Sequence, residues 1–232
     1  NDWDKLIKWD IPNRYERVRQ DLIPNGIVSQ YTYNQLSESS GAAFNSPKFY
    51  DHNQYLSQLL LLAQIVDDDF QRSIQELFGV DSLKHEAIIP FNDDTEGEEA
   101  KTKEKTGDGK MTYSRGPVKL IDRARVKAET DYANEDYPSS ACVLDLNRCC
   151  LIFNDISTLL RAVEIFVNKV KYYQSGAIIG IARAKNGFIE YVKDGVQYAD
   201  IKLNVLIKGK HNNIIGEVQF LLQVMKEFKD KA

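Results

Sequence analysis

The chain has 232 residues, a length that can bury a core in one large domain or two small ones. Its composition, 43% hydrophobic and 28% charged, is ordinary for a soluble globular protein. The formal net charge of -4 argues against a protein that coats nucleic acid, because such proteins need a basic surface. No apolar run is long enough to span a membrane, since the longest, 56–66, is interrupted by polar residues.

The cysteines indicate the compartment. Cys142, Cys149 and Cys150 lie in one apolar stretch, and their spacing matches neither a zinc site nor a disulfide framework. We therefore expect buried free thiols in a reducing compartment, with an intracellular, cytoplasmic location. The chain starts at Asn1 without an initiator methionine and ends within a helical pattern, so we expect it to be part of a longer protein.

Residues 1–91 are predicted to form a helical N-terminal region that packs on the core. Bulky residues at helical spacing predict short helices over 3–9 and 15–23. Apolar residues then recur every three or four positions from 53 to 78, which predicts a long amphipathic helix ended by Gly79. The simplest interpretation of this long helix is packing against a neighbouring domain or a partner protein.

Residues 92–114 are predicted to form a charged linker or loop. Asp, Glu, Lys, Thr and Gly make up almost all of 92–110, so this stretch cannot bury enough apolar surface to order itself. Its mixed charges would also suit a phosphate or partner site, but an exposed loop is the simpler interpretation.

Residues 115–232 are predicted to form an α+β core, a mixed β-sheet flanked by helices. Strands are predicted at four apolar or alternating segments: 141–153, 178–182, 198–205 and 216–220. The last two segments are separated by a turn rich in Gly and Asn, which predicts a hairpin.

Three helices are predicted around these strands. The first begins at Gly116, where Pro117 suits an early helical position. The second is capped by Asp155 or Ser157 and carries a regular apolar face, and the third starts at Leu221.

Two carboxylates are predicted to lie in strands, where a free charge is costly. Asp145 lies in the apolar segment 143–146, and Glu217 lies between Gly216 and Val218. A buried carboxylate needs a partner or a metal. Two carboxylates on neighbouring strands can share a divalent cation, and Mg²⁺ prefers such oxygen ligands together with phosphate.

Basic residues that would suit a nucleoside triphosphate accompany these carboxylates in the sequence. They are Lys119, Arg123, Arg125, Lys127, Arg148, Arg183 and Lys185. The alternative is structural: Asp145 caps or pairs with Arg148, and Glu217 pairs with Lys202 across the hairpin. On the residues alone this structural alternative is the simpler one.

The order of these motifs resembles the synthetase domain of RelA/SpoT proteins, which fold like nucleotidyltransferases and make guanosine tetra- and pentaphosphate alarmones. Gly116-Pro-Val-Lys119, followed by Arg123 and Lys127 at four-residue steps, is similar to the family's Gly-Arg-x-Lys helix. Asp145 and Arg148 are similar to its magnesium-binding Asp strand and the Arg that follows.

The hairpin carries the rest of the resemblance, which extends from about Arg115 to the end of the chain. Tyr198-Ala-Asp-Ile-Lys202 is similar to the family's Gly-Tyr-x-Ser-x-His strand, whose Tyr stacks on the guanine of the acceptor. Glu217-Val-Gln219 matches Glu-x-Gln on the next strand.

The chain departs from the family's pattern mainly on the side of the ATP donor. Pro117 replaces the Arg that stacks on adenine, and Arg123 replaces the helix Ser. Asp200 and Lys202 replace the Ser and His of the Tyr strand, and Leu221 replaces the Arg that often follows Glu-x-Gln. These departures mark a divergent member in which donor recognition is eroded.

The resemblance implies binding of a nucleoside triphosphate or guanine nucleotide with Mg²⁺, and transfer of a pyrophosphate or nucleotidyl group to a nucleotide hydroxyl. Asp145 and Glu217 would hold the metal and be the catalytic residues. The nucleotide-binding residues would be Lys119, Arg123, Lys127, Arg148, Arg183, Lys185, Tyr198, Lys202 and Gln219. The alternative is an inactive domain that serves a larger protein or assembly as a structural or interaction module, docked through its N-terminal helices.

Overall fold

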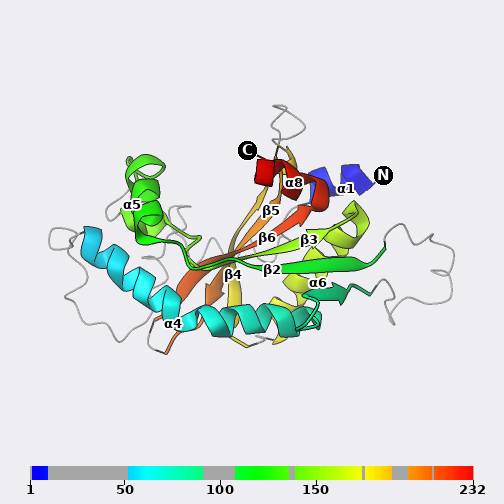
Figure 1. Ribbon diagram of the computed structural model, residues 1–232, viewed down its shortest axis with the longest axis horizontal. Coiled ribbons are helices and arrows are strands. Elements are labelled where there is room, and N and C mark those ends of the chain that lie inside the picture. Colours follow the sequence, from blue (N-terminus) through cyan, green and yellow to red (C-terminus); the bar gives the residue numbers. More distant parts are fainter. Residues whose placement is uncertain are drawn as a thin grey trace.

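The computed structural model describes residues 2–9, 52–90, 108–135, 139–173, 176–189, 198–210 and 212–231. The helix predicted over 15–23 and the polar stretch 92–107 lie outside the described residues. The described part is a mixed β-sheet flanked by helices, so the predicted α+β fold class is confirmed (Figure 1).

The sheet has six strands in the order β1-β2-β3-β6-β5-β4. They are β1 (Glu86–Ile88), β2 (Lys110–Arg115), β3 (Arg148–Phe153), β4 (Ile178–Asn186), β5 (Ile201–Ile207) and β6 (Ile214–Leu222). The central pair, β3 and β6, is parallel, and every other neighbouring pair is antiparallel. Strands β5 and β6 form the predicted hairpin.

The helices lie on two sides of this sheet (Figure 1). They are α1 (Asp2–Lys8), α4 (His52–Phe78), α5 (Ile121–Thr130), α6 (Ile156–Tyr173) and α8 (Gln223–Lys231). Helix α4 runs below the strands in the view of Figure 1, α6 overlaps them, and α5 and α8 lie above β2. Helix α4 matches its predicted range, and Gly79 ends it with a φ of 64°, a value that favours glycine.

Aromatic side chains join α4, α6 and the sheet into one core. Phe166 of α6 meets Phe220 of β6 edge to face, with the ring centroids 5.7 Å apart. Phe78 at the end of α4 stacks on Phe166 from the other side at 6.3 Å. Of the two predicted caps of α6, Asp155 and Ser157, the structure shows Asp155. Its Oδ1 accepts a hydrogen bond from the Thr158 amide at 2.8 Å.

The opposite face of the sheet has a polar centre beside a small apolar cluster of Leu144, Ala182 and Ile215. Side chains alternate between the two faces of a strand, so residues two apart share a face. Val218 and Phe220 of β6 belong to the core, whereas Glu217 and Gln219 point to the other face. The register continues this polar surface across the hairpin, where Asn204 of β5 lies opposite Glu217 and Lys202 lies opposite Gln219. It extends to β4, where Arg183 lies opposite Asn204 and Lys185 lies opposite Lys202.

Two of the predicted element boundaries are wrong near Asp145. The strand predicted over 141–153 begins only at Arg148, and a short 3₁₀-helix, Ser139–Cys142, precedes it. Asp145 therefore lies in the connection that enters β3. The helix predicted from Gly116 begins at Ile121, because the amides of Gly116 and Lys119 bond to the carbonyls of Arg148 and Leu146 instead.

Other predicted boundaries shift by a few residues. Residues 110–114 were expected in the linker, but they form most of β2, which pairs with both β1 and β3. Tyr198 and Asp200 precede β5 instead of lying within it, and the last helix starts at Gln223 because β6 continues through Leu222.

A buried polar network fixes the connection that carries Asp145 to helix α4. Asn147 Nδ2 donates to the Ala63 carbonyl at 2.8 Å and to Asp67 Oδ1 at 2.9 Å. Asp67 is also bound by Gln71 and by the guanidinium of Arg115. These bonds hold Asn147 against α4. Strand β3 therefore begins only at the next residue, Arg148.

None of the three cysteines forms a disulfide. Cys142 and Cys149 are buried free thiols, as expected, and Cys150 is a free thiol that is half-buried. Among the helices of the described residues, none has the length and apolar character needed to cross a membrane.

Candidate nucleotide-binding site

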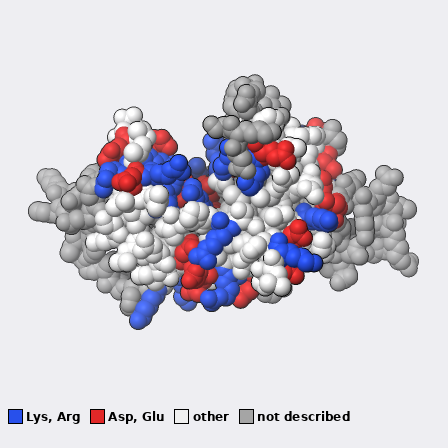
Figure 2. Space-filling model, in the orientation of Figure 1, with Lys and Arg blue, Asp and Glu red and all other residues white. Residues whose placement is uncertain are grey.

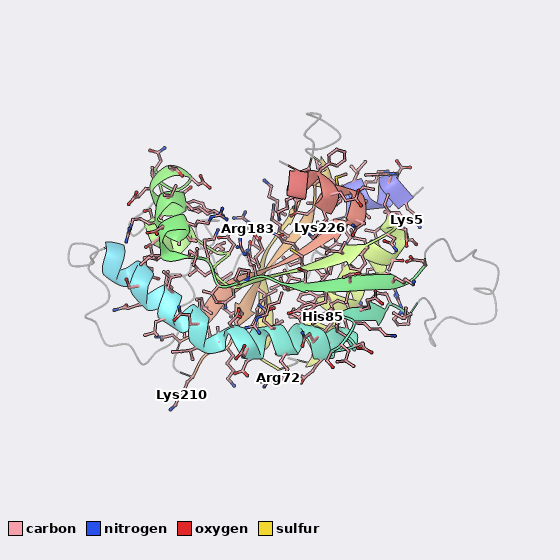
Figure 3. The ribbon with its side chains drawn as sticks, in the orientation of Figure 1. Lys5, Arg72, His85, Arg183, Lys210 and Lys226 are labelled. Atoms are coloured by element: carbon pink, nitrogen blue, oxygen red, sulfur yellow. The ribbon has the colours of Figure 1, made fainter. Side chains whose placement is uncertain are left out.

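A cavity of about 360 Å³ lies on the polar face of the sheet. It is lined by Lys127, Tyr132, Leu144, Asp145, Arg183, Lys185, Tyr198, Lys202, Asn204, Glu217, Gln219 and Lys229. Figure 2 shows Lys and Arg side chains on both sides of a hollow between α5 and α8. In Figure 3, Arg183 lies in the interval between these two helices, and Lys226 lies beside α8.

The structure brings most of the predicted site residues together in this cavity. Lys119 reaches it indirectly, through its contact with Asp145. Arg123 and Arg148 are not among its lining residues. Arg123 is exposed on α5, and the side chain of Arg148 packs against Gly116, where an added Cβ would lie 2.6 Å from Arg148 Cγ.

Four lining residues were not predicted from the sequence: Tyr132, Leu144, Asn204 and Lys229. Asn204 and Lys202 follow the same alternation along β5, so strand periodicity would have found Asn204. Tyr132 follows the end of α5 and Lys229 lies on α8, and only the tertiary structure decides the positions of these two helices over the sheet.

Parallel pairing of β3 and β6 places the two carboxylates near each other. Parallel strands begin at the same edge of a sheet, so the residues before β3 lie near the first half of β6. Arg148, the first residue of β3, is the register partner of Glu217. The Glu217 amide donates to the Asn147 carbonyl at 2.9 Å, which ties β6 to the connection that carries Asp145.

Asp145 is an ionised, doubly paired carboxylate. Its Oδ2 lies 2.9 Å from Lys119 Nζ and 2.9 Å from Lys127 Nζ. Burial alone would raise the pKa of Asp145, but the bond from Lys119 and the charge of Lys127 outweigh it, so the pKa lies below its ordinary value. Asp145 Oδ1 is buried and has no hydrogen-bond partner among the described residues.

Glu217 has the opposite electrostatic character. It is buried and accepts a hydrogen bond from Gln219 Nε2 at 2.6 Å, but no Lys or Arg of the described chain forms an ion pair with it. Burial raises the pKa of Glu217, and the negative charge of Asp145 raises it further. Two carboxyls with pKa values shifted in opposite directions therefore face one cavity, a pattern typical of acid–base sites.

The ion pairs expected for Asp145 and Glu217 under the structural alternative are both wrong. Asp145 pairs with Lys119 and Lys127 instead of Arg148. Lys202 pairs with Asp200 at 3.0 Å, and this leaves Glu217 without its expected cation.

Tyr198 forms an aromatic wall of the cavity and is held from several sides. Its hydroxyl donates to Asp200 Oδ2 at 2.7 Å. The ammonium groups of Lys202 and Lys229 lie 5.9 Å and 5.3 Å from its ring centroid, within the range of cation–π attraction. The ring is thereby fixed at the edge of a strongly cationic surface, which suits stacking on a base that carries phosphates.

Asp145 and Glu217 are suitable ligands for a Mg²⁺ ion that is bound together with a nucleotide. Among the residues that the structure describes, no group of three or more His, Cys, Asp or Glu side chains is arranged to hold a metal. Mg²⁺ bound with nucleotides, however, needs only one or two carboxylates, since phosphates and water supply its other ligands. The unpartnered Oδ1 of Asp145 and the carboxyl of Glu217 are such ligands, so the residues fit the ion.

The raised pKa of Glu217 predicts a pH-dependent loss of stability. The folded protein holds this proton more tightly than the unfolded chain, so stability falls as the pH rises from the ordinary value of 4.5 through the folded-state pKa. Glu217→Gln cannot lose this proton. The difference in melting temperature between the variant and wild type is therefore expected to grow in favour of the variant as the pH rises through this window, and to stay constant at higher pH. Thermal unfolding of both proteins from about pH 4 to pH 8 measures the difference; a difference independent of pH would contradict the raised pKa.

Comparisons with known proteins place the fold. No protein-family model and no curated protein sequence matches the chain. Among solved structures, small alarmone synthetase 1 from Bacillus subtilis bound to its product pppGpp matches with a TM-score of 0.50 and 9% identity, covering 77% of each chain. Small alarmone synthetase 2 from Bacillus subtilis matches with a TM-score of 0.46 and 13% identity, covering 75% of this chain and 76% of that one.

A GTP pyrophosphokinase family protein from Streptococcus pneumoniae matches with a TM-score of 0.41 and 13% identity, covering 74% of this chain and 75% of that one. The fold assignment depends on the first of these three matches, since its TM-score alone reaches 0.5. The chain has the fold of a small alarmone synthetase, and the RelA/SpoT-like fold predicted from the sequence is confirmed.

Proposed function

We propose that the cavity binds a nucleoside polyphosphate together with Mg²⁺ and transfers its pyrophosphate, or a nucleotidyl group, to a hydroxyl of a second nucleotide. One observation carries this proposal: cationic side chains from several elements converge on a cavity that also holds two carboxylates. The cationic residues are Lys127 on α5, Arg183 and Lys185 on β4, Lys202 on β5 and Lys229 on α8. Such a surface suits a ligand with several negative charges.

The cationic residues would bind the phosphates and offset the charge of the transition state. Phosphoryl transfer needs little covalent help from the protein, so positioning and electrostatic stabilisation account for most of the rate. Arg183 and Lys185 project from one face of a paired strand, which holds them more rigidly than a loop would.

Asp145 and Glu217 would hold Mg²⁺, which would supply positive charge to offset that of the phosphates. Lys119 and Lys127 neutralise Asp145 in the described structure. Both ammonium groups bind the same oxygen, Oδ2, and the buried Oδ1 has no hydrogen-bond partner among the described residues.

Glu217 is the candidate base. The acceptor hydroxyl would lose its proton to Glu217 while its oxygen forms a bond to the β-phosphorus of the triphosphate. The bond from that phosphorus to the oxygen shared with the α-phosphate would break, and the nucleoside monophosphate would leave with that oxygen. A raised pKa suits this role, because a carboxylate with a higher pKa is a stronger base.

A second candidate is an inactive domain that serves as an interaction module. Pro117 offers no charge or stacking plane for a donor base, and Arg123 and Arg148 do not line the cavity. Leu61 and Ile65 are 59% and 64% exposed on one side of α4, where a protein partner would find an apolar surface. Nucleotide binding and transfer distinguish the two candidates, and the first implies an intracellular protein because its substrates are intracellular.

Isothermal titration with ATP, GTP and GDP, each with and without Mg²⁺, tests the proposed function. We expect binding of at least one nucleotide, strengthened by Mg²⁺ and weakened by Arg183→Ala. Incubation of ATP with GDP or GTP, followed by chromatography, is expected to show release of AMP. Absence of heat with every nucleotide would overturn the proposal, and binding without AMP release would reduce it to a nucleotide-binding module.

A further inference from the structure

Asn204 has a buried hydrogen-bond donor that the fold does not use. It lies on β5, is 3% exposed and lines the cavity. Its Nδ2 has no hydrogen-bond partner among the described residues. Most buried polar groups in folded proteins are paired, so an unpaired donor facing a cavity needs an explanation.

Asn147 is a buried asparagine whose side-chain donor stabilises the fold. Its Nδ2 is buried and donates to both the Ala63 carbonyl and Asp67 Oδ1. Asn204 is similarly buried, and its Nδ2 bonds to nothing that the structure describes. Each of the two asparagines has one buried atom without a partner among the described residues, Oδ1 in Asn147 and Nδ2 in Asn204, but only Asn204 lines the cavity, so only its unpaired group lies next to a position for a ligand.

The register places this donor beside the candidate base. Asn204 is the direct cross-strand partner of Glu217 on β6 and of Arg183 on β4. Directly opposed side chains on one face of an antiparallel pair lie about 5 Å apart at Cβ. A single ligand atom between the two strands can therefore contact both the Asn204 amide and the Glu217 carboxyl.

We propose that Asn204 Nδ2 donates a hydrogen bond to the ribose hydroxyl oxygen whose proton Glu217 accepts, and thereby selects nucleotides that carry this hydroxyl. This inference rests on the proposed function and adds the group that recognises the acceptor. A hydroxyl satisfies both residues at once, since its oxygen accepts from Asn204 while its proton is donated to Glu217. The amide thus turns the O–H bond toward the base.

A phosphate oxygen fits this position less well. Phosphate oxygens only accept hydrogen bonds, so a phosphate on Asn204 could not also donate to the neighbouring Glu217 carboxyl, whereas a hydroxyl can. Cationic side chains that suit phosphate line the same cavity on β4, β5 and α8, as Arg183, Lys202 and Lys229. The Asn204 amide beside the Glu217 carboxyl therefore suits a neutral hydroxyl better than a phosphate.

The test uses Asn204→Leu, which keeps the shape of the side chain and removes the donor. Titrations compare GDP with 2′-deoxy-GDP and 3′-deoxy-GDP on wild type and variant, with Mg²⁺ present. Wild type is expected to bind one of the deoxy analogues more weakly than GDP. The variant is expected to bind GDP about tenfold more weakly and that analogue with unchanged affinity, so the preference for the hydroxyl falls about tenfold.

Thermal unfolding without ligand provides a second readout. Asn204→Leu removes a buried unpaired donor, so its melting temperature is expected to stay the same or rise by about 2 to 4 °C. Asn147→Leu is the matched control, and it is expected to melt at a lower temperature because its donor is used by α4. A fall in the melting temperature of Asn204→Leu comparable to that of the control would overturn the inference.

The binding outcomes separate this inference from the proposed function. If wild type binds no nucleotide, the proposed function fails and the inference fails with it. If wild type binds GDP and Asn204→Leu keeps the full preference for the hydroxyl, the inference fails and nucleotide binding stands. Equal weakening of GDP and both deoxy analogues would assign Asn204 to a phosphate or the base and would also overturn the hydroxyl assignment.

Discussion

Glu217→Gln is expected to lower the rate of AMP release from ATP in the presence of the acceptor by about 10²–10⁴-fold, the usual contribution of a general base. The variant keeps the shape of the side chain and its hydrogen bond with Gln219, but it cannot accept the proton of the hydroxyl. It also removes a carboxyl whose pKa is raised by burial, so the same variant is expected to be more stable above that pKa. Loss of activity with a gain of stability is a combination that a misfolded variant does not produce.

Initial rates at several acceptor concentrations check this expectation. At saturating Mg²⁺ the loss should fall mainly on kcat, because the proton transfer occurs in the transition state, whereas loss of a Mg²⁺ ligand alone would mainly raise KM. Glu129→Gln is the matched control, since Glu129 is an exposed glutamate on α5 that does not line the cavity. A Glu217→Gln rate within twofold of that control would exclude Glu217 as the base.

Asp145→Asn is expected to lower the free energy of unfolding by about 3 kcal/mol, the scale of removing one member of a buried ion pair. Asp145 is the shared counterion of Lys119 and Lys127, and the amide that replaces it cannot balance two ammonium charges. The same change removes the carboxylate oxygen that would hold Mg²⁺. The dependence of nucleotide affinity on Mg²⁺ is therefore expected to weaken.

Urea unfolding at neutral pH, together with titration of nucleotide with and without Mg²⁺, measures both effects. Asp122→Asn is the matched control: Asp122 pairs with Arg125 on the same helix but is 85% exposed, so the change should cost less than about 1 kcal/mol. The low pKa of Asp145 gives a further check, because its stabilisation is present above the ordinary value of 3.8 and is lost as the pH falls through the folded-state pKa. Equal stability of the two variants would show that the Lys119–Asp145–Lys127 cluster does not stabilise the fold.

The sequence was sufficient to predict the fold class because the periodic signals are local. The apolar spacing of 53–78 predicted α4, and the alternation on either side of a Gly- and Asn-rich turn predicted the β5–β6 hairpin. The same alternation identified Lys202, Glu217 and Gln219, which now share the lining of one cavity.

The errors lie where distant segments compete for the same backbone groups. Lys119 was predicted inside a helix, but its amide bonds to the Leu146 carbonyl, and the helix starts at Ile121. Asn147 was predicted inside a strand, but its side chain bonds to α4, and the strand starts one residue later. Neither bond has a signature in the sequence around it, because its partner lies far away along the chain.

The sequence by itself determined which residues carry charge on the polar face of the sheet, since period-two alternation fixes the face to which a strand residue points. Tertiary structure alone decided which charges meet. It paired Asp145 with Lys119 and Lys127 and paired Asp200 with Lys202. It left Glu217 without an ion pair, and Asn204 Nδ2 without an acceptor, among the residues that the structure describes. The reason is physical: the energy of a charge depends on burial and on neighbours within a few ångströms, and strand register and helix packing set both.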